Sequence, residues 1–186
     1  MRGNAVLAVD EFQETPAVEI KDKEGCKGIF AKENISNDTV IFFLKGKITR
    51  RPTRYTIQIG NNRHLASPAI RKADDEMDYC WLYLNHNCEP NGYINIDELT
   101  FRARRDIAAG DEITFNYLTT ESELAAPFNC TCGATTCFGL IRGRDFLTPA
   151  EAERLSRVDE DSALFITADA EDSKTRTDRR DAAGLS

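Results

Sequence analysis

The sequence contains few of the motifs on which hydrolases and dinucleotide-dependent enzymes rely. Only two histidines occur among its 186 residues, His64 and His86. Neither is accompanied by the Gly-x-Ser-x-Gly turn that presents a nucleophilic serine. The Gly-x-Gly-x-x-Gly turn of dinucleotide-binding domains is also missing. The sequence therefore gives no support for serine hydrolase or dinucleotide-dependent redox chemistry.

Long apolar stretches are absent too. No run approaches the roughly 20 residues that a membrane-spanning helix needs. The apolar stretch 5–9 is too short for the core of a signal peptide. We therefore expect an intracellular protein outside the membrane, in the nucleus if its source is eukaryotic and in the cytoplasm if it is bacterial. The sequence gives no indication of the oligomeric state.

Basic charge does not predominate either: 24 lysines and arginines face 31 aspartates and glutamates, a formal net charge of −7. Proteins that bind nucleic acid by themselves present a basic face, so we expect no direct nucleic-acid binding. Residues 145–186 hold 11 of the acids and 6 of the bases. This acidic segment would favour encounter with a basic partner, although a solvated tail explains it more simply.

The chain does have six cysteines, which inside a cell indicate metal binding or chemistry before disulfides. Cys130, Cys132 and Cys137 lie close together, and the small residues between them are typical of a turn. Three such thiolates can hold one tetrahedral zinc ion if a fourth ligand joins them. The candidates for that ligand are the other cysteines and the two histidines: Cys26, Cys80, Cys88, His64 and His86. The alternative is that the cysteines are buried free thiols.

Most of the predicted secondary structure is β. Short alternating or apolar runs bounded by glycines indicate strands, and they lie at 18–20, 40–44, 55–59, 99–103 and 113–117. One helix is clear: Thr148, Pro149 and Glu151 form a capping box with proline at the first helical position. We expect that helix to end near Val158 and the chain beyond Asp169, poor in large apolar residues, to be disordered.

Three further segments concentrate groups useful for chemistry. Residues 84–91 contain three asparagines and His86, residues 110–117 form a strand that ends in Tyr117, and two glycines lie in 24–31. Each has a simpler interpretation by itself. The first segment can be an ordinary polar loop. The second can end in a half-buried core tyrosine whose hydroxyl is hydrogen-bonded, and the third can be a turn.

Together, these segments closely resemble the SET-domain protein lysine methyltransferases that carry a post-SET zinc motif. Lys27-Gly28-Ile29-Phe30-Ala31 resembles the opening Gly-x-Gly segment of that family, and Leu84 to Asn91 resembles its Asn-His-Ser-Cys-x-Pro-Asn block. Ala103 to Tyr117 resembles its closing block, and Phe128 to Gly143 its post-SET Cys-x-Cys-x4-Cys. The four blocks occur in order within residues 17–143.

The resemblance implies a mostly β SET-domain fold. It consists of several small twisted sheets with a C-terminal pseudoknot and a post-SET zinc knuckle, to which this chain adds the short C-terminal helix. We expect four parts: an N-terminal strand or extension at 1–16, the SET domain at 17–120, the post-SET zinc segment at 121–144, and an acidic helix and tail at 145–186.

The resemblance also implies S-adenosylmethionine and zinc as cofactors. Tyr117 matches the catalytic tyrosine of the family, and Phe115 occupies the position that tunes how many methyl groups are added. Cys88 supplies the fourth zinc ligand beside Cys130, Cys132 and Cys137. The residues implied in cofactor binding are Lys27, Gly28, Ile29, Asn85, His86 and Leu140.

The function so implied is S-adenosylmethionine-dependent methylation of a lysine in a histone or other basic protein, beyond the monomethyl stage. One alternative is a SET-like zinc- and cofactor-binding module that has lost catalysis. Leu44, where many active members carry a tyrosine, favours it, whereas Tyr117, Asn85 and His86 oppose it. The other alternative is methylation of a small amine or a non-histone protein.

Overall fold

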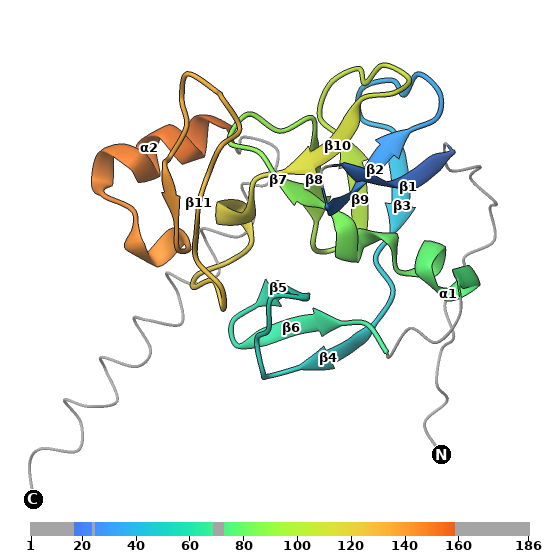
Figure 1. Cartoon of the computed structure of the whole chain (residues 1–186). Helices are drawn as coiled ribbons and strands as arrows, with labels where there is room; N and C mark the ends of the chain where they lie inside the picture. Colours follow the sequence, from blue (N-terminus) through green and yellow to red (C-terminus); the bar gives the residue numbers. More distant parts are fainter. Residues whose placement is uncertain (1–16, 24, 69–72, 159–186) are drawn as a thin grey trace, which may run out of the picture.

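The computed structural model describes residues 17–23, 25–68 and 73–158 (Figure 1). The expected N-terminal extension at 1–16 and the expected disordered tail lie outside these residues. The described part contains four small sheets and short helices, in agreement with the predicted mostly β architecture.

The sheet that positions the site has four strands. β1 (Val18–Lys23) pairs antiparallel with β2 (Cys26–Ala31), and β2 pairs antiparallel with β10 (Glu112–Phe115). On its other side, β10 runs parallel to β7 (Asn85–His86). The closing strand therefore lies between two segments that precede it by many residues, which is the arrangement of the predicted pseudoknot.

A second sheet supplies part of the main hydrophobic core. β9 (Thr100–Ala103) lies between β3 (Val40–Phe43) and β8 (Gly92–Asn95), antiparallel to both. Its Phe101 is fully buried and stacks on Phe42 with 5.0 Å between ring centroids. The same ring meets Phe115 of β10 edge to face, so the core directly supports the closing strand.

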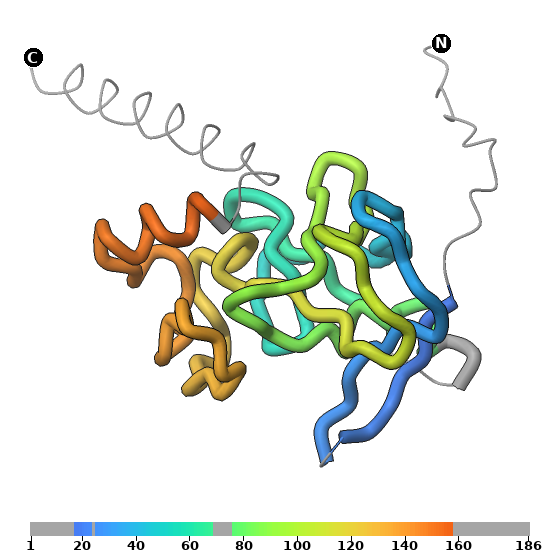
Figure 2. The backbone as a smooth tube through the Cα atoms, turned by 90° about the horizontal axis from the view of Figure 1, so that it is seen from above, coloured from blue at the N-terminus to red at the C-terminus, as the bar shows by residue number. Residues whose placement is uncertain are grey.

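The third sheet, β4 (Lys47–Thr49), β6 (Arg63–Ala66) and β5 (Thr56–Gly60), is antiparallel and is drawn below the other two in Figure 1. Its buried apolar side chains, Ile57, Ile59 and Leu65, belong to the same hydrophobic core. The fourth sheet is the short pair β11 (Phe128–Asn129) and β12 (Leu140–Ile141). Figure 2 shows this C-terminal part at one end of the molecule, away from the β1–β2 hairpin.

The helices of the described residues are short. α1 (Ala73–Asp78) and η1 (Cys80–Tyr83) precede β7, while η3 (Arg144–Phe146) leads to α2 (Pro149–Val158). The predicted capping box is present, because Thr148 and Glu151 exchange side-chain-to-backbone hydrogen bonds of 2.8 and 3.3 Å. Within the described residues no helix has both the length and the apolar character needed to cross a membrane.

The predicted strand 113–117 is too long by two residues. Asn116 leaves the strand because its side-chain Oδ1 accepts the backbone N–H of Leu118, at 3.0 Å, and thereby caps η2 (Tyr117–Thr119). Tyr117 consequently begins a 3-10 turn just beyond the edge of the sheet, rather than continuing the alternation of the strand.

The stacked core predicts a difference between two phenylalanines on paired strands. We expect Phe101→Ala to lower the free energy of unfolding by about 3–5 kcal/mol, because it leaves a cavity in a fully buried site. Phe43→Ala, at a site 45% exposed, should cost about 1 kcal/mol. Urea unfolding of both variants checks this, and equal losses would contradict the assigned core.

Candidate active site and cysteine cluster

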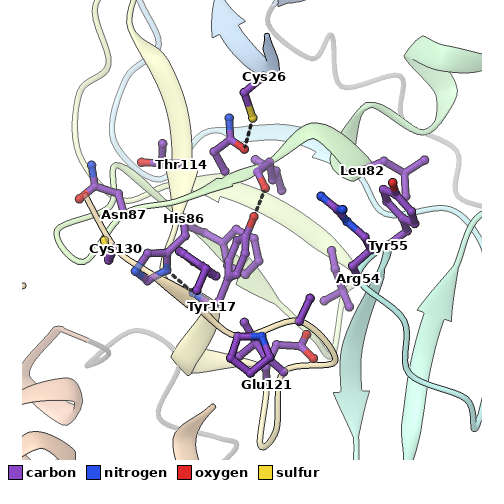
Figure 3. A pocket seen from close by; sticks show the side chains of 18 of the residues that line it. Cys26, Arg54, Tyr55, Leu82, His86, Asn87, Thr114, Tyr117, Glu121 and Cys130 are labelled. Atoms are coloured by element: carbon purple, nitrogen blue, oxygen red, sulfur yellow. Dashed lines mark hydrogen bonds between the residues drawn. The ribbon is translucent and has the colours of Figure 1, made fainter. Parts of the chain in front are cut away.

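A pocket of about 880 Å³ lies where three parts of the chain meet (Figure 3). One wall comes from the segment that leads into β5, a second from β7 and β10, and the third from residues 124–132. Of the predicted site residues, the pocket brings together Asn85, His86, Phe115 and Tyr117 along with Cys130 and Cys132.

Tyr117 is held at three points. Its hydroxyl donates to the Leu84 carbonyl at 2.6 Å, and its backbone N–H donates to His86 Nδ1 at 3.1 Å. Its ring lies 4.8 Å from that of Phe115 and 5.9 Å from that of Phe128, measured between centroids. Burial raises the pKa of the Tyr117 phenol well above its ordinary value, so the hydroxyl stays protonated at neutral pH.

His86 connects Tyr117 to the cysteines. Because Nδ1 accepts the Tyr117 N–H, the ring proton is assigned to Nε2, which lies 3.3 Å from Cys88 Sγ and can donate to it. Burial lowers the pKa of His86 to about 4, which keeps the imidazole neutral in this role. A single side chain thus touches both the candidate catalytic tyrosine and the cysteine cluster.

Two asparagines of the polar block hold β10 in place. Asn91 donates to the Glu112 carbonyl at 2.8 Å and accepts from the Thr114 N–H at 2.9 Å. Asn85 Nδ2 donates to the Lys27 carbonyl at 3.1 Å and to the Glu112 carboxylate at 2.7 Å. The polar block therefore fixes β10 by hydrogen bonds, a role that an ordinary polar loop would not have.

The remaining predicted cofactor residues lie beside the pocket without lining it. Lys27 and Gly28 lie next to Asn85, and a Cβ at Gly28 would approach the side-chain Oε1 of Glu112 to 2.7 Å, so side chains pack closely against the backbone of Gly28. Ile29 is fully buried in the core. Leu140 is 51% exposed on β12, opposite Asn129, which does line the pocket.

Four further residues line the pocket, Cys26, Arg54, Tyr55 and Glu121, and of these Arg54 and Glu121 were not anticipated from the sequence. Tyr55 places an aromatic ring at the pocket, whereas Leu44 is buried in the core and does not line it. Glu121 is the most unusual of the four, because its carboxyl is buried and that burial raises its pKa to about 7. Its position four residues after Tyr117 was the only signal in the sequence.

The cysteine cluster consists of Cys88, Cys130, Cys132 and Cys137, whose sulfur atoms all lie within 4.8 Å of one another. Cys88 Sγ lies 3.8 Å from the sulfurs of both Cys130 and Cys137. Four thiolates bound tetrahedrally at about 2.3 Å from zinc are separated by about 3.8 Å, so the geometry fits such an ion. Cys88 is the fourth member, in agreement with the resemblance and against the other candidates.

The surroundings of the cluster favour a metal over free thiols. Backbone N–H groups donate to three of the sulfurs at 3.4 Å, from Phe138, Cys132 and Gly139. Burial raises the pKa of Cys88 above its ordinary value and that of Cys130 to about 11. Without a cation the Cys88 and Cys130 thiols would be protonated, and a divalent ion, if bound, would supply the charge that stabilises them as thiolates.

Comparison with known proteins finds SET-domain proteins. The family model of the SET domain matches residues 27–118. The methyltransferase flvH of Aspergillus flavus is 42% identical over 80 residues, which cover 41% of this chain and 42% of that protein. A histone-lysine N-methyltransferase of Aspergillus oryzae, H3 lysine-36 specific, is 40% identical over 68 residues, 33% of this chain and 7% of that protein. The chain thus spans less than half of the length of either relative.

Solved structures support the fold. The methyltransferase domain of the human histone-lysine N-methyltransferase SETMAR superposes with a TM-score of 0.51 at 16% identity, over 69% of this chain and 59% of that one. KRYPTONITE, solved with mCHG DNA and SAH, gives the same TM-score at 17% identity, over 67% and 29% of the two chains. These similarities confirm the predicted fold of small sheets.

Proposed function

This chain belongs to the SET-domain family of methyltransferases, and from that premise we propose that it transfers a methyl group from S-adenosylmethionine to the side-chain amine of a lysine in a protein. The observation that carries the proposal is the fixed, protonated hydroxyl of Tyr117 inside a pocket bordered by Asn85 and His86. The volume and mixed lining of the pocket suit a cofactor together with a side chain.

The cofactor, when bound, supplies an electrophilic methyl group on a sulfonium. The protein contributes position and protonation state. Trp81, Leu84 and Phe115 give part of the lining an apolar character, which disfavours an ammonium and lowers the pKa of an amine held there. Because the Tyr117 hydroxyl donates its proton to the Leu84 carbonyl, its oxygen is left to accept an N–H of that amine and to orient the nitrogen lone pair.

We propose a histone or another basic protein as the substrate. The name of the Aspergillus oryzae relative, a histone-lysine N-methyltransferase, supports the first choice. The Aspergillus flavus relative is named only as a methyltransferase, without a substrate, and we keep a non-histone protein as the second candidate. We further assign residues 17–120 to the SET domain and 121–144 to the post-SET segment, and we expect no direct contact with nucleic acid.

The role of Tyr117 predicts that Tyr117→Phe lowers methyl transfer at least about 100-fold, because the variant loses the hydroxyl that orients the amine. The measurement is incorporation of label from S-adenosylmethionine into core histones and a cell extract. Tyr93→Phe is the matched control, since Tyr93 lies on β8 of the second sheet and its hydroxyl bonds to Asp38, and neither residue lines the pocket. Full activity in Tyr117→Phe would refute the assignment.

The cysteine cluster predicts about one zinc ion per chain. Metal analysis by mass spectrometry of purified protein should find it in the wild type and in Cys26→Ser, which lies outside the cluster. Cys137→Ser should lose the metal and unfold at a lower temperature, because the C-terminal segment is then no longer tied to Cys88. Equal zinc content in Cys137→Ser and the wild type would show that the cluster is not the site.

Phe115 predicts the extent of methylation. Its ring is buried beside Tyr117 and carries no hydroxyl to fill the space around the amine. We therefore expect dimethyl or trimethyl product from the wild type and mainly monomethyl product from Phe115→Tyr, measured by mass spectrometry of the labelled substrate. Monomethyl product alone from both proteins would count against this role.

A further inference from the structure

Glu121 lies in the pocket wall one turn after Tyr117. Its backbone N–H donates to the Tyr117 carbonyl at 2.9 Å, so its position is fixed relative to the candidate catalytic residue. The residue is 9% exposed, and it borders the pocket (Figure 3). Neither the proposed chemistry at Tyr117 nor the cysteine cluster uses this carboxyl.

Only one oxygen of the carboxyl is occupied by the fold. Oε1 accepts the Gln58 N–H of β5 at 2.7 Å and the Thr120 hydroxyl at 3.3 Å. Oε2 has no hydrogen-bond partner among the described residues. The carboxyl is thus anchored on one side and left with an acceptor available on the other.

The negative charge is not needed for this anchoring. A glutamine amide oxygen would accept the same two hydrogen bonds without the cost of burying a charge. The surroundings of Glu121 shift the pKa of its carboxyl in opposite directions. Burial raises its pKa to about 7, while the hydrogen bonds from Gln58 and Thr120 and the charge of Arg144 lower it. Arg54 lines the same pocket but lies over the Tyr55 ring, at 5.1 Å from its centroid.

We propose, on the premise of the function given above, that Glu121 is a specificity residue: its ionised carboxylate binds the ammonium group of the lysine side chain as it enters the pocket. The site would take a primary alkylammonium and disfavour a neutral chain of the same length. The ammonium pairs with Glu121 first; it then gives its proton to solvent water, and the resulting neutral amine reaches the Tyr117 hydroxyl. The two positions differ, because the Tyr117 hydroxyl points to Leu84 while Glu121 is anchored to β5.

The substrate, and not the sulfonium of the cofactor, is the cation that this position suits. Asn85 and His86 lie on β7 and Cys26 on β2, whereas Glu121 is bonded to β5. In Figure 3, Glu121 and Cys26 are drawn on opposite sides of the Tyr117 ring. Arg54 and Tyr55, which lead into β5, border the same pocket from the third sheet.

The test measures binding of n-butylammonium, which has the length and charge of a lysine side chain, to the full chain with S-adenosylhomocysteine present. NMR titrations at pH 8 and pH 6 compare the wild type, Glu121→Gln and Glu123→Gln. Glu123 is exposed, lies two residues away and does not line the pocket, so its variant removes the same charge from a neighbouring position. The probe stays fully protonated at both pH values because its pKa is close to that of lysine, about 10.4.

We expect the wild type to bind n-butylammonium more weakly at pH 6 than at pH 8, by up to about tenfold. The reason is that the ionised fraction of a carboxyl with a pKa of about 7 falls from about nine-tenths to about one-tenth over that range. Glu121→Gln should bind equally weakly at both pH values, and Glu123→Gln should behave as the wild type. Binding of neutral n-butanol should be the same in all three proteins.

Two results would overturn the proposal: no detectable n-butylammonium binding by the wild type, or equal binding by the wild type and Glu121→Gln at pH 8. Tighter S-adenosylhomocysteine binding by the wild type than by Glu121→Gln, with n-butylammonium binding unchanged, would assign the carboxyl to the cofactor instead. The assay needs no methyl transfer, so it is independent of failure of the proposed function, which the Tyr117→Phe comparison reveals.

Urea unfolding tests whether Glu121→Gln is folded. The folded-state pKa of Glu121 is raised above that of the unfolded chain, so ionisation of Glu121 destabilises the native state as the pH rises toward 7. Glu121→Gln should therefore have a higher urea midpoint than the wild type at pH 8 and a similar midpoint at pH 4. A variant that is more stable yet binds the ammonium less well separates a role in recognition from a role in folding.

Discussion

The hydrogen bonds that hold β10 between β2 and β7 are the constraint on which the site depends. β10 pairs with strands that lie far from it in sequence, and the Asn91 amide binds the backbone of β10 at Glu112 and Thr114. Because Tyr117 follows directly after β10, the position of its hydroxyl is set by this pairing. The Phe101 ring supports the same strand from the core through Phe115.

The segment that contains β7 also contributes Cys88 to the cysteine cluster. Cys88 follows Asn85 and His86 within one short segment, so a metal ion bound there is fixed to the edge of β10. His86 extends the connection by touching Cys88 with one ring nitrogen and Tyr117 with the other. The cysteine cluster and Tyr117 are therefore linked through one neutral imidazole, and two members of the cluster, Cys130 and Cys132, also line the pocket.

The sequence predicted site residues well where they belong to a motif of fixed spacing. It predicted them poorly where the fold brings together residues that are distant in sequence. Cys130, Cys132 and Cys137 are close in sequence, and the resemblance added Cys88, which the structure places with them. Glu121 could not be predicted as a pocket residue because its environment depends on Gln58, which a distant strand brings to it. Tyr55 reaches the pocket for a similar reason, through the placement of the third sheet.

The local boundary at Asn116 shows the same limit. Alternation extended the strand to Tyr117, but one side-chain hydrogen bond to Leu118 ended it earlier.

The most direct test of the whole account is a crystal structure with S-adenosylhomocysteine and zinc. We expect the ligand between Asn85, His86 and Phe128 with its sulfur directed toward the Tyr117 hydroxyl, and one metal ion among the four cysteines. A ligand bound outside this pocket, or cysteines without metal in zinc-saturated crystals, would contradict the account.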